Sequence, residues 1–541
     1  MLDSFFIIPG SIIILLLAVY STKKFKTECM LCLLVFSSSC LFAQVTPIDT
    51  IVPGNGTPKE QIKQIKEEKV KLLLDSAGTQ PKKSPLIDTT IQNKYGDLLR
   101  DDIQFNKKYP LWKPAFGVLG NNVSAWLLDR FIYNYSYSRI GPKTWNSNIQ
   151  KGWEWDDDPF GINFIGHPYS GSMYFNSARS RGYNFVQSVP FAVAGSLMWE
   201  YFGENTRPSY NDIINTPING AFIGEILYRL SSNILDDRTI GGGRVFREVV
   251  AGLIDPVRGF NRLLQGKSFR ITTKEVYQKE PINITLLVGL HKINQSNNTV
   301  FGDGPNDALI NVQLDYGNPF EIIARKPFDF FRLRTAFSFG AGTTGRKIVD
   351  NITGYGILFG NNTHIGKLSM LYGAFQYYDY WDNKTFELGA IGFGGGLSTK
   401  YSFSKTINLY TNAHLAIVPL AGNSTRFGPD TSKVRDYTYN DGLEAKFEST
   451  LNLGKYLSAS FTYQSYMIHT TVGPAGNNYI NILNPRITVN LYKSISIGFE
   501  HFVYYDDRYL KNFVAIHSSR TEQKIFLSWF LEDPQRKGRY N

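Results

Sequence analysis

One histidine and several carboxylates are the residues best suited to chemistry in the first half of the chain. His167 is followed at a distance by Glu200, Glu204 and Asp212, in surroundings that are otherwise strongly apolar. An imidazole beside carboxylates can carry out general acid–base catalysis or hold a hard metal ion. These four residues are therefore the candidate catalytic group, and the sequence leaves the metal and any other cofactor unknown.

Further polar residues are candidates for ligand binding because they lie near these groups along the chain. They are Asn163, Tyr169, Arg179, Arg207 and Asn211. Ser170 and Ser209 lack the glycine pattern of a hydrolase nucleophile elbow. The sequence thus supplies acids, bases and binding groups without a nucleophile motif.

A structural role for the same groups is an open alternative. A histidine before a proline at a helix entry is often an ordinary turn residue. Glu200 and Glu204 are four residues apart and would share one face of a helix. On a helix this apolar they would need partners, because an unpaired buried charge is costly. Arg179, Arg207 and Arg229 could supply those partners.

The stretch around the histidine is the most distinctive part of the sequence. It reads Asn163-Phe-Ile-Gly-His-Pro-Tyr-Ser-Gly171, and polar, glycine-containing segments follow up to Glu225. This stretch resembles the family called domain of unknown function 3943, over roughly residues 110–265. The resemblance implies no established activity. More distantly, the order His, Glu, Arg-x-Ser-x-x-Asp and paired glycines is similar to VanZ-like membrane proteins, whose Asp-Lys before the histidine is missing here.

Apolar segments of helical length must position the candidate residues. They run over residues 185–202, 213–235 and 244–264. Gly220 and Gly224 have a spacing that lets helices approach closely. The segments are too short or too interrupted to span a membrane independently. We therefore expect a mainly α-helical module over residues 110–267, packed on itself or against the rest of the chain.

Residues 281–532 change to an apolar period of two, and short turns there, one of them at 360–362, alternate with longer polar loops, among them 378–384 and 470–478. This arrangement predicts a membrane β-barrel of about twelve antiparallel strands, with both chain ends on the short-turn side. In this barrel we expect Leu443, Phe447, Leu457 and Phe461 to face lipid, and Glu444, Glu448 and Ser460 to face the lumen.

The composition agrees with a membrane barrel. Charged residues make up 19% of the 541 residues, against roughly 25% in an average soluble domain. Aromatic residues are abundant, with 38 Phe, 32 Tyr and 8 Trp. A multi-span helical transporter is excluded as an interpretation, because apolar runs of about 20 residues are missing beyond the first fifty positions.

The first 43 residues are predicted to be a leader. Its second apolar stretch, from Cys29 to Phe42, has the pattern of a signal peptide cut between Ala43 and Gln44, similar to those of Bacteroidetes-type bacteria. The part upstream is interpreted as an over-extended gene start, with a membrane anchor or a lipoprotein at Cys40 as alternatives. All three cysteines lie in this leader, so thiol catalysis and zinc–thiolate sites are excluded for the processed chain.

The remaining segments are expected to be connectors. Residues 44–109 form a polar linker, with one short helix at 59–74, residues 268–280 join the module to the barrel, and residues 533–541 form a tail. The net charge of +11 is scattered along the chain, so nucleic acid is not an expected partner, whereas outer-membrane lipid and a lipid or glycan ligand are. The oligomeric state is left open.

Three functions remain open from sequence. The first is an outer-membrane protein in a structural or binding role, whose helical module plugs or docks on the periplasmic mouth of the barrel. The second is an envelope enzyme that modifies lipid or glycan with His167, Glu200, Glu204 and Asp212. The third is a diffusion channel for small solutes, although a narrow twelve-stranded lumen and the apolar module weigh against it. In each case the expected location is the cell outer membrane.

Overall fold

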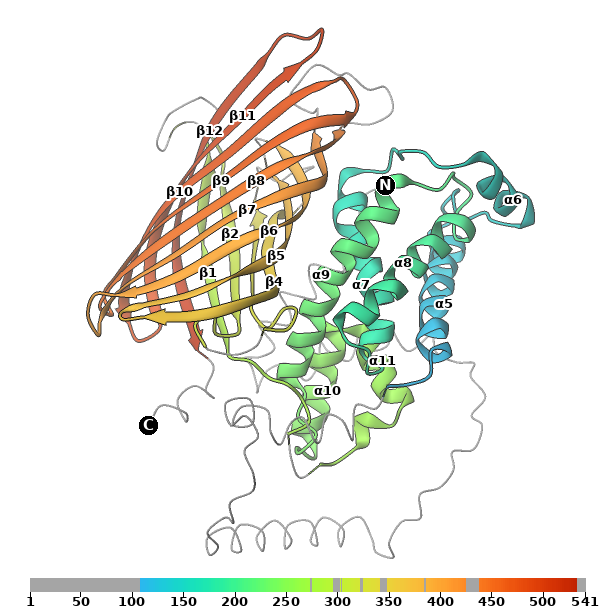
Figure 1. Cartoon of the computed structure of the whole chain (residues 1–541), viewed down its shortest axis with the longest axis horizontal. Coiled ribbons are helices and arrows are strands. Elements are labelled where there is room, and N and C mark those ends of the chain that lie inside the picture. Colours follow the sequence, from blue (N-terminus) through green and yellow to red (C-terminus); the bar gives the residue numbers. More distant parts are fainter. Residues whose placement is uncertain are drawn as a thin grey trace, which may run out of the picture.

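The chain folds into a bundle of helices beside a large barrel of strands (Figure 1). A computed structural model describes residues 108–272, 275–294, 302, 304–321, 325–340, 348–383, 386–424 and 437–532. The predicted signal peptide and its cleavage point, the helix at 59–74 and the tail at 533–541 lie outside the described residues.

The described helices follow the apolar segments of the sequence closely. The expected helix at 185–202 is α8, and the expected segment at 244–264 is two helices, because Pro256 starts a new one and the Asp255 side chain accepts a hydrogen bond from the Arg258 amide. Within the described residues, no helix combines the length and apolarity needed to cross a membrane. The helical elements are α5 (Trp112–Leu127), η1 (Leu128–Ile132), α6 (Pro142–Lys151), η2 (Ile162–Gly166), α7 (His167–Arg179), α8 (Phe185–Phe202), α9 (Tyr210–Ile234), α10 (Gly242–Ile254), α11 (Pro256–Leu264) and η3 (Lys267–Phe269).

Glycines bring α7 and α9 into close contact at the centre of the module. A Cβ atom on Gly171 would lie 1.8 Å from the Thr216 carbonyl oxygen and 3.0 Å from the Gly220 Cα atom. Any side chain at either position would therefore push the two backbones apart. This close crossing brings the start of α7, where His167 lies, beside the first half of α9.

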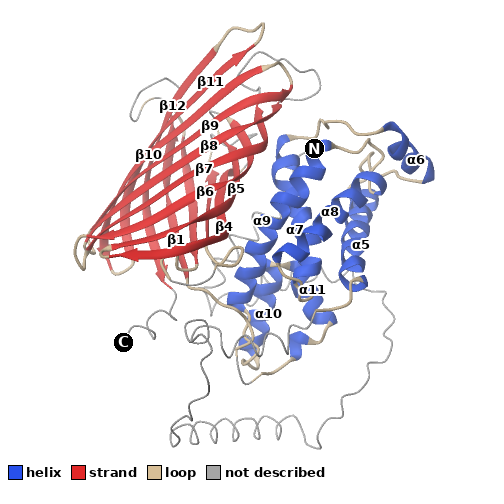
Figure 2. Cartoon of the chain, in the orientation of Figure 1, coloured by secondary structure: helices blue, strands red, loops and turns tan. Residues whose placement is uncertain are grey.

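Twelve antiparallel strands form a closed barrel, as the alternation in the sequence predicts (Figure 2). The last strand pairs with the first over residues 522–532 and 283–293, which closes the barrel. Closure gives the edge strands backbone partners that an open edge in hydrocarbon would lack. The strands are β1 (Ile282–Ile293), β2 (Asn306–Tyr316), β3 (Phe331–Phe339), β4 (Val349–Ile365), β5 (Leu368–Asp382), β6 (Glu387–Ser402), β7 (Ile407–Ser424), β8 (Tyr437–Leu453), β9 (Leu457–Val472), β10 (Gly476–Tyr492), β11 (Ile495–Leu510) and β12 (Ile516–Glu532).

The two ends of the barrel differ in their connections. At one end, short turns join consecutive strands at residues 366–367, 403–406, 454–456 and 493–494, and β1 begins and β12 ends there. Several connections at the other end are longer, including 294–305, 340–348 and 425–436. In outer-membrane barrels the short turns face the periplasm.

The strands are longer than the sequence suggests, and this removes some expected loops. They contain 9 to 18 residues, whereas about 9–11 tilted residues suffice to span a membrane. Most of the loops expected at 378–384 and 470–478 therefore belong to strands, and the turn expected at 360–362 lies inside β4. The alternation of apolar and polar residues continues in the parts of the strands that extend beyond the membrane. It therefore does not show where a strand ends.

The two faces of the barrel wall agree with the predicted alternation. Leu443, Phe447 and Phe461 are exposed on the outside, whereas Glu444 is buried on the inside. Ser460 lines the lumen, and Leu457, beside the 454–456 turn, also borders the lumen opening.

The helical module lies against the outer wall of the barrel, so its predicted placement at the periplasmic mouth is wrong (Figure 1). The ring of Phe164 fills the space above Gly389 and Gly422, whose added Cβ atoms would lie 2.2 and 2.3 Å from it. The Tyr378 hydroxyl donates to the Phe164 carbonyl oxygen at 2.5 Å, and Gln376 Nε2 donates to the Ile218 carbonyl oxygen at 2.9 Å. Glycines and polar groups on the outward face of the barrel form the contact surface for the module. The alternation of apolar and polar residues alone does not predict this surface.

A second set of contacts holds the module near the short-turn end of the wall. Arg229 of α9 forms an ion pair with Asp329 at 3.1 Å and donates to the Pro327 carbonyl oxygen at 2.6 Å. Phe222 packs edge-on against Phe328, with ring centroids 5.3 Å apart. Because α9 contacts the wall at both levels, the module is fixed alongside the barrel.

Candidate functional site

The first candidate site lies where the 153–158 segment, α7 and the start of α9 meet. The backbone of Glu154 pairs with this region, since its amide donates to the Pro208 carbonyl oxygen at 2.9 Å and its carbonyl oxygen accepts from the Tyr210 amide at 2.9 Å. This short parallel bridge brings the acidic residues that follow Glu154 beside α9. We call the resulting group of His167, Glu200, Asp212, Asp156 and Asp158 the acidic cluster.

His167 sits between two carboxylates of the acidic cluster. Its Nε2 atom is 3.5 Å from Asp158 Oδ2 and 3.6 Å from Asp212 Oδ1. Burial alone would lower the pKa of His167, but the neighbouring carboxylates, Asp158 first, raise it above its ordinary value. The geometry therefore favours an imidazolium that bridges two acids.

Ser209 ties Glu200 to Asp212. Glu200 Oε2 accepts from the Ser209 amide at 2.7 Å and lies 3.0 Å from the Ser209 hydroxyl, which also contacts Asp212 Oδ2. A hydroxyl has one hydrogen, so it cannot donate to both carboxyl groups, and one of them must be protonated to donate in return. Burial raises the pKa of Glu200 to about 7 and raises the pKa of Asp212 as well.

Asp156 is the ionised member of the acidic cluster. It accepts hydrogen bonds from the Tyr439 hydroxyl at 2.8 Å, from Asn163 Nδ2 at 2.9 Å and from Asn211 Nδ2 at 2.9 Å. Burial opposes ionisation, but hydrogen bonds from Asp212 and Asn211, the charge of His167 and the hydrogen bond from Asn163 lower the pKa of Asp156 below its ordinary value. A barrel tyrosine thus completes the site from outside the module.

The structure brings together most of the residues chosen from sequence. Asn163 and Asn211 lie within the acidic cluster beside His167, Glu200 and Asp212, as the contacts above show. Glu204 lies just beyond the end of α8, and its pKa is raised by burial and then by the charge of Glu200.

The other chosen residues lie apart, and the arginines do not neutralise Glu200 and Glu204. Arg179 and Arg229 both bind Glu225, at 2.7 and 2.8 Å. Arg207 pairs with Glu154 at 3.2 Å. Tyr169, two residues from His167 on α7, is outside the acidic cluster; burial of its ring and then the charge of Asp255 raise the pKa of Tyr169 to about 12.

Sequence reasoning missed Asp156, Asp158 and Ser209. The signal was present, since Asp156 to Asp158 form a run of three acids directly after two tryptophans and before an apolar turn. Among the residues that the structure describes, no group of His, Cys, Asp and Glu has the arrangement of a metal site. The Ser209 hydroxyl contacts the carboxyl groups of Glu200 and Asp212.

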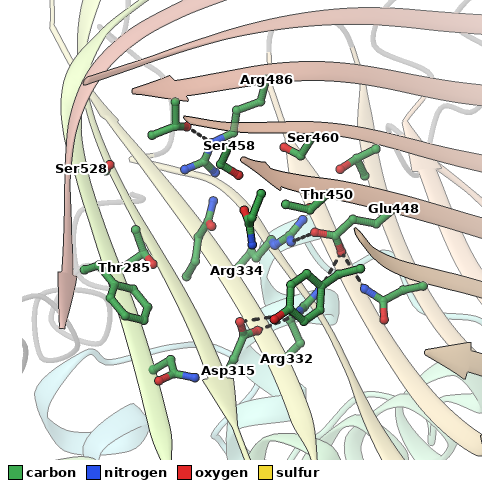
Figure 3. Close-up of a pocket in the computed structure, with 18 of the residues that line it drawn as sticks. Thr285, Asp315, Arg332, Arg334, Glu448, Thr450, Ser458, Ser460, Arg486 and Ser528 are labelled. Atoms are coloured by element: carbon green, nitrogen blue, oxygen red, sulfur yellow. Dashed lines mark hydrogen bonds and ion pairs between the residues drawn. The ribbon is translucent and has the colours of Figure 1, made fainter. Parts of the chain in front are cut away.

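The second candidate site is the barrel lumen, which contains a cavity of about 1310 Å³ (Figure 3). Residues of the turns at 454–456 and 493–494 border its opening, so it opens at the short-turn end. Many small hydroxyl and amide side chains line it, among them Thr285, Asn311, Gln313, Asn412, Thr450, Ser458, Ser460, Asn484 and Ser528.

Three arginines in the cavity are paired with carboxylates. Arg332 contacts Asp315 at 2.5 Å and Glu448 at 2.8 Å, and Arg334 contacts Glu448 at 2.5 Å (Figure 3). Arg486 lies 3.3 Å from Glu500. The sequence signal for the first pair was the alternation of Arg332 and Arg334 in β3, which puts both on the lumen face.

The cavity borders a cluster of buried apolar side chains. Trp381 and Phe502 line the cavity and also belong to this cluster. Its other members include Phe386, Leu388, Tyr466, Ile468, Ile480 and Tyr504.

A closed barrel of twelve antiparallel strands, with short turns at one end, an apolar outside and a polar lumen, is an outer-membrane β-barrel. Residues 152–257 match the family described as Domain of unknown function (DUF3943), which confirms the resemblance seen in the sequence. The match includes all of α7, α8 and α9 and the acidic cluster. A comparison with curated proteins gives no match.

Solved outer-membrane barrels are similar to the barrel half of the chain at low identity. The outer membrane channel DcaP of Acinetobacter baumannii is 8% identical, with 46% of this chain and 96% of that chain covered and a TM-score of 0.22. In-vitro folded OmpT of Vibrio cholerae gives the same four values. An anion-selective porin from Comamonas acidovorans is 8% identical, covering 46% and 99%, with a TM-score of 0.19. At these values the comparison carries no information on function.

Proposed function

We propose that this protein is a non-conducting outer-membrane binding protein, whose barrel lumen takes a small glycan-type ligand from the periplasmic side. The observation that carries the proposal is the polar cavity of about 1310 Å³ at the short-turn end, which meets the apolar cluster at Trp381 and Phe502. A diffusion channel needs a continuous wet path, and we infer that the apolar cluster interrupts it.

The lining of the cavity favours a ligand rich in hydroxyl groups. Serine, threonine, asparagine and glutamine side chains offer donors and acceptors in many directions, as a sugar requires. The lumen arginines are engaged with Asp315, Glu448 and Glu500, so the charges of these arginines are compensated. A hydroxyl-rich surface of this kind suits a glycan better than an apolar molecule.

The opening of the cavity favours acidic members of this ligand class. Lys400, Lys455 and Lys493 border it, and each lies within about 5.5 Å of a tyrosine ring centroid, at Tyr410, Tyr456 and Tyr492. Cations at a mouth raise the local concentration of anions and speed their entry, an effect that salt weakens. We therefore expect carboxylated sugars to bind more tightly than neutral ones at low salt.

Ligand titration of the purified protein tests this proposal. Trp381 lies at the floor of the cavity, so its fluorescence should change when trigalacturonic acid binds, and the signal should vanish in a Trp381→Phe variant. Maltotriose serves as the neutral probe. A Ser460→Trp variant, which fills the cavity, should weaken binding by at least tenfold, about 1.4 kcal/mol.

Ala459→Trp is the matched control, because residue 459 lies on the same strand but on the opposite, outward face. It should bind trigalacturonic acid like the wild type. If the wild type binds neither sugar, or if the two tryptophan variants bind alike, the lumen is not the binding site.

A second candidate function is an envelope enzyme that modifies lipid or glycan with the acidic cluster. The contacts of His167 with Asp158 and Asp212, and the pKa of Glu200 at about 7, favour it, because an acid–base catalyst needs a pKa near the working pH. In a deletion strain with a measurable defect, Glu200→Gln and His167→Ala should then assemble normally and fail to rescue. Full rescue by both variants would rule out this enzyme.

A further inference from the structure

The outer face of α5 and η1 carries a long apolar stripe. The exposed side chains recur every three to four residues on this face, and they are Leu111, Trp112, Phe116, Leu119, Val123, Leu127, Leu128, Phe131 and Ile132. Phe116 is 64% exposed and Phe131 69% exposed, and the exposed side chains of residues 111–132 include none that is charged. At 1.5 Å per residue the stripe is about 33 Å long, close to the thickness of a bilayer hydrocarbon core.

In α10 and α11 the arginines point inward and apolar side chains point outward, which is the reverse of the usual arrangement in a soluble protein. Their arginines point inward, and Arg258 and Arg262 are each 4% exposed. Arg262 binds Asp237 at 3.0 Å and Glu248 at 2.7 Å, so its charge is compensated inside the module. The outward face is apolar instead, with Val245, Phe246, Val249, Leu253, Phe260, Leu263, Leu264 and Phe269 exposed.

The position of the module against the barrel explains both features. It covers a part of the outer wall that runs from the Phe164 seat on Gly389 and Gly422 down to the contact between Arg229 and Asp329 near the short turns. The uncovered wall beside it is also apolar, with Leu415, Ile417, Leu443 and Met467 exposed. The stripe of the module therefore extends the apolar belt of the barrel.

We propose that the outer face of the helical module contacts the acyl chains of the outer membrane, as a lateral extension of the barrel. The α5–η1 stripe faces the hydrocarbon core, and α10 and α11 lie with their apolar face in the periplasmic leaflet, as amphipathic interfacial helices do. The occupant of this face is lipid, because the face is continuous with a belt that a membrane barrel presents to lipid. Polar groups of the module, the acidic cluster included, then lie inside, against one another and against the barrel.

Spin-label accessibility tests this proposal in the full chain. With Cys29, Cys32 and Cys40 replaced by serine, single cysteines at Phe116, Leu119 and Leu263 receive a nitroxide in liposomes of phosphatidylethanolamine and phosphatidylglycerol. We expect these labels to collide severalfold more with apolar oxygen than with a water-soluble nickel complex, as a label at Leu443 on the barrel belt should.

Labels at Lys143 and Gln150 are the matched controls, because both residues are exposed polar positions on α6. They should favour the nickel complex. If the labels at 116, 119 and 263 also favour the nickel complex, the face is in water and the proposal is overturned. Low accessibility to both reagents would overturn it too, since a protein, such as a second copy, would then cover the face.

Discussion

At the scale of single residues, the acidic cluster stores protons in a buried place. Ser209 lies between Glu200 and Asp212, and its one hydrogen requires that a carboxyl group there be protonated. His167 stands between Asp158 and Asp212 and is held toward its charged form. The nearby arginines are engaged elsewhere, so protonation rather than ion pairing limits the negative charge.

The raised pKa of Glu200 makes stability depend on pH in a defined window. Below its ordinary value of 4.5 the group is protonated in both the folded and the unfolded chain, and between 4.5 and about 7 only the folded chain keeps the proton. Stability is therefore highest at low pH and is lost as pH rises through about 7. At about 1.4 kcal/mol per pKa unit, the loss amounts to about 3 kcal/mol.

Melting curves of the helical circular dichroism signal at pH 5 and pH 8 check this prediction. The wild type should melt at a lower temperature at pH 8, and Glu200→Gln, which cannot ionise, should lose the part of that difference that Glu200 contributes. An equal pH dependence of the two proteins would show that Glu200 is not the group that takes up the proton.

At the scale of elements, the sequence predicts the type of each segment well and their mutual placement poorly. The helix at 185–202 and the alternation around Glu444 follow from local periodicity, which burial on one face produces. The ends of the long strands and the break at Pro256 were less visible. The docking position of the module on the barrel wall could not be predicted. Gly389 and Gly422 leave space for the Phe164 ring only when β6 and β7 pair, and Phe164 is distant from both in sequence.

The contact between the Phe164 ring and Gly389 gives a prediction about how the helical module docks on the barrel. In Gly389→Val the new Cβ would meet the Phe164 ring at 2.2 Å, so the ring must leave its seat, and overpacking of this kind costs about 1–3 kcal/mol. Valine suits a strand, so the barrel itself should persist. We expect trypsin to cut the helical module faster in this variant, while the barrel keeps its heat-dependent shift on gels.

Gly395→Val on the same strand is the control, since an added Cβ there has no atom within 4 Å among the described residues. It should be cut at the wild-type rate. Equal protection of the module in both variants would mean that the Phe164 seat does not hold the module in place.

At the scale of the whole molecule, the same chain combines a closed barrel, a laterally attached bundle and a lumen with a polar cavity at the short-turn end. The barrel class follows from composition, alternation and turn lengths, and it was predictable. The apolar cluster in the lumen was not, because Trp381, Tyr466 and Tyr504 come from three different strands and Phe386 precedes a fourth. Each of these residues has no distinctive sequence pattern until the barrel closes.

The central claim is that the lumen binds and does not conduct, and electrical recording in planar lipid bilayers tests it most directly. Purified protein inserted from detergent should give no stable current steps in 1 M KCl, with a trimeric porin recorded alongside to show that insertion is detected. Steady, repeatable steps that scale with the salt concentration would show an open path through the barrel and would contradict the account.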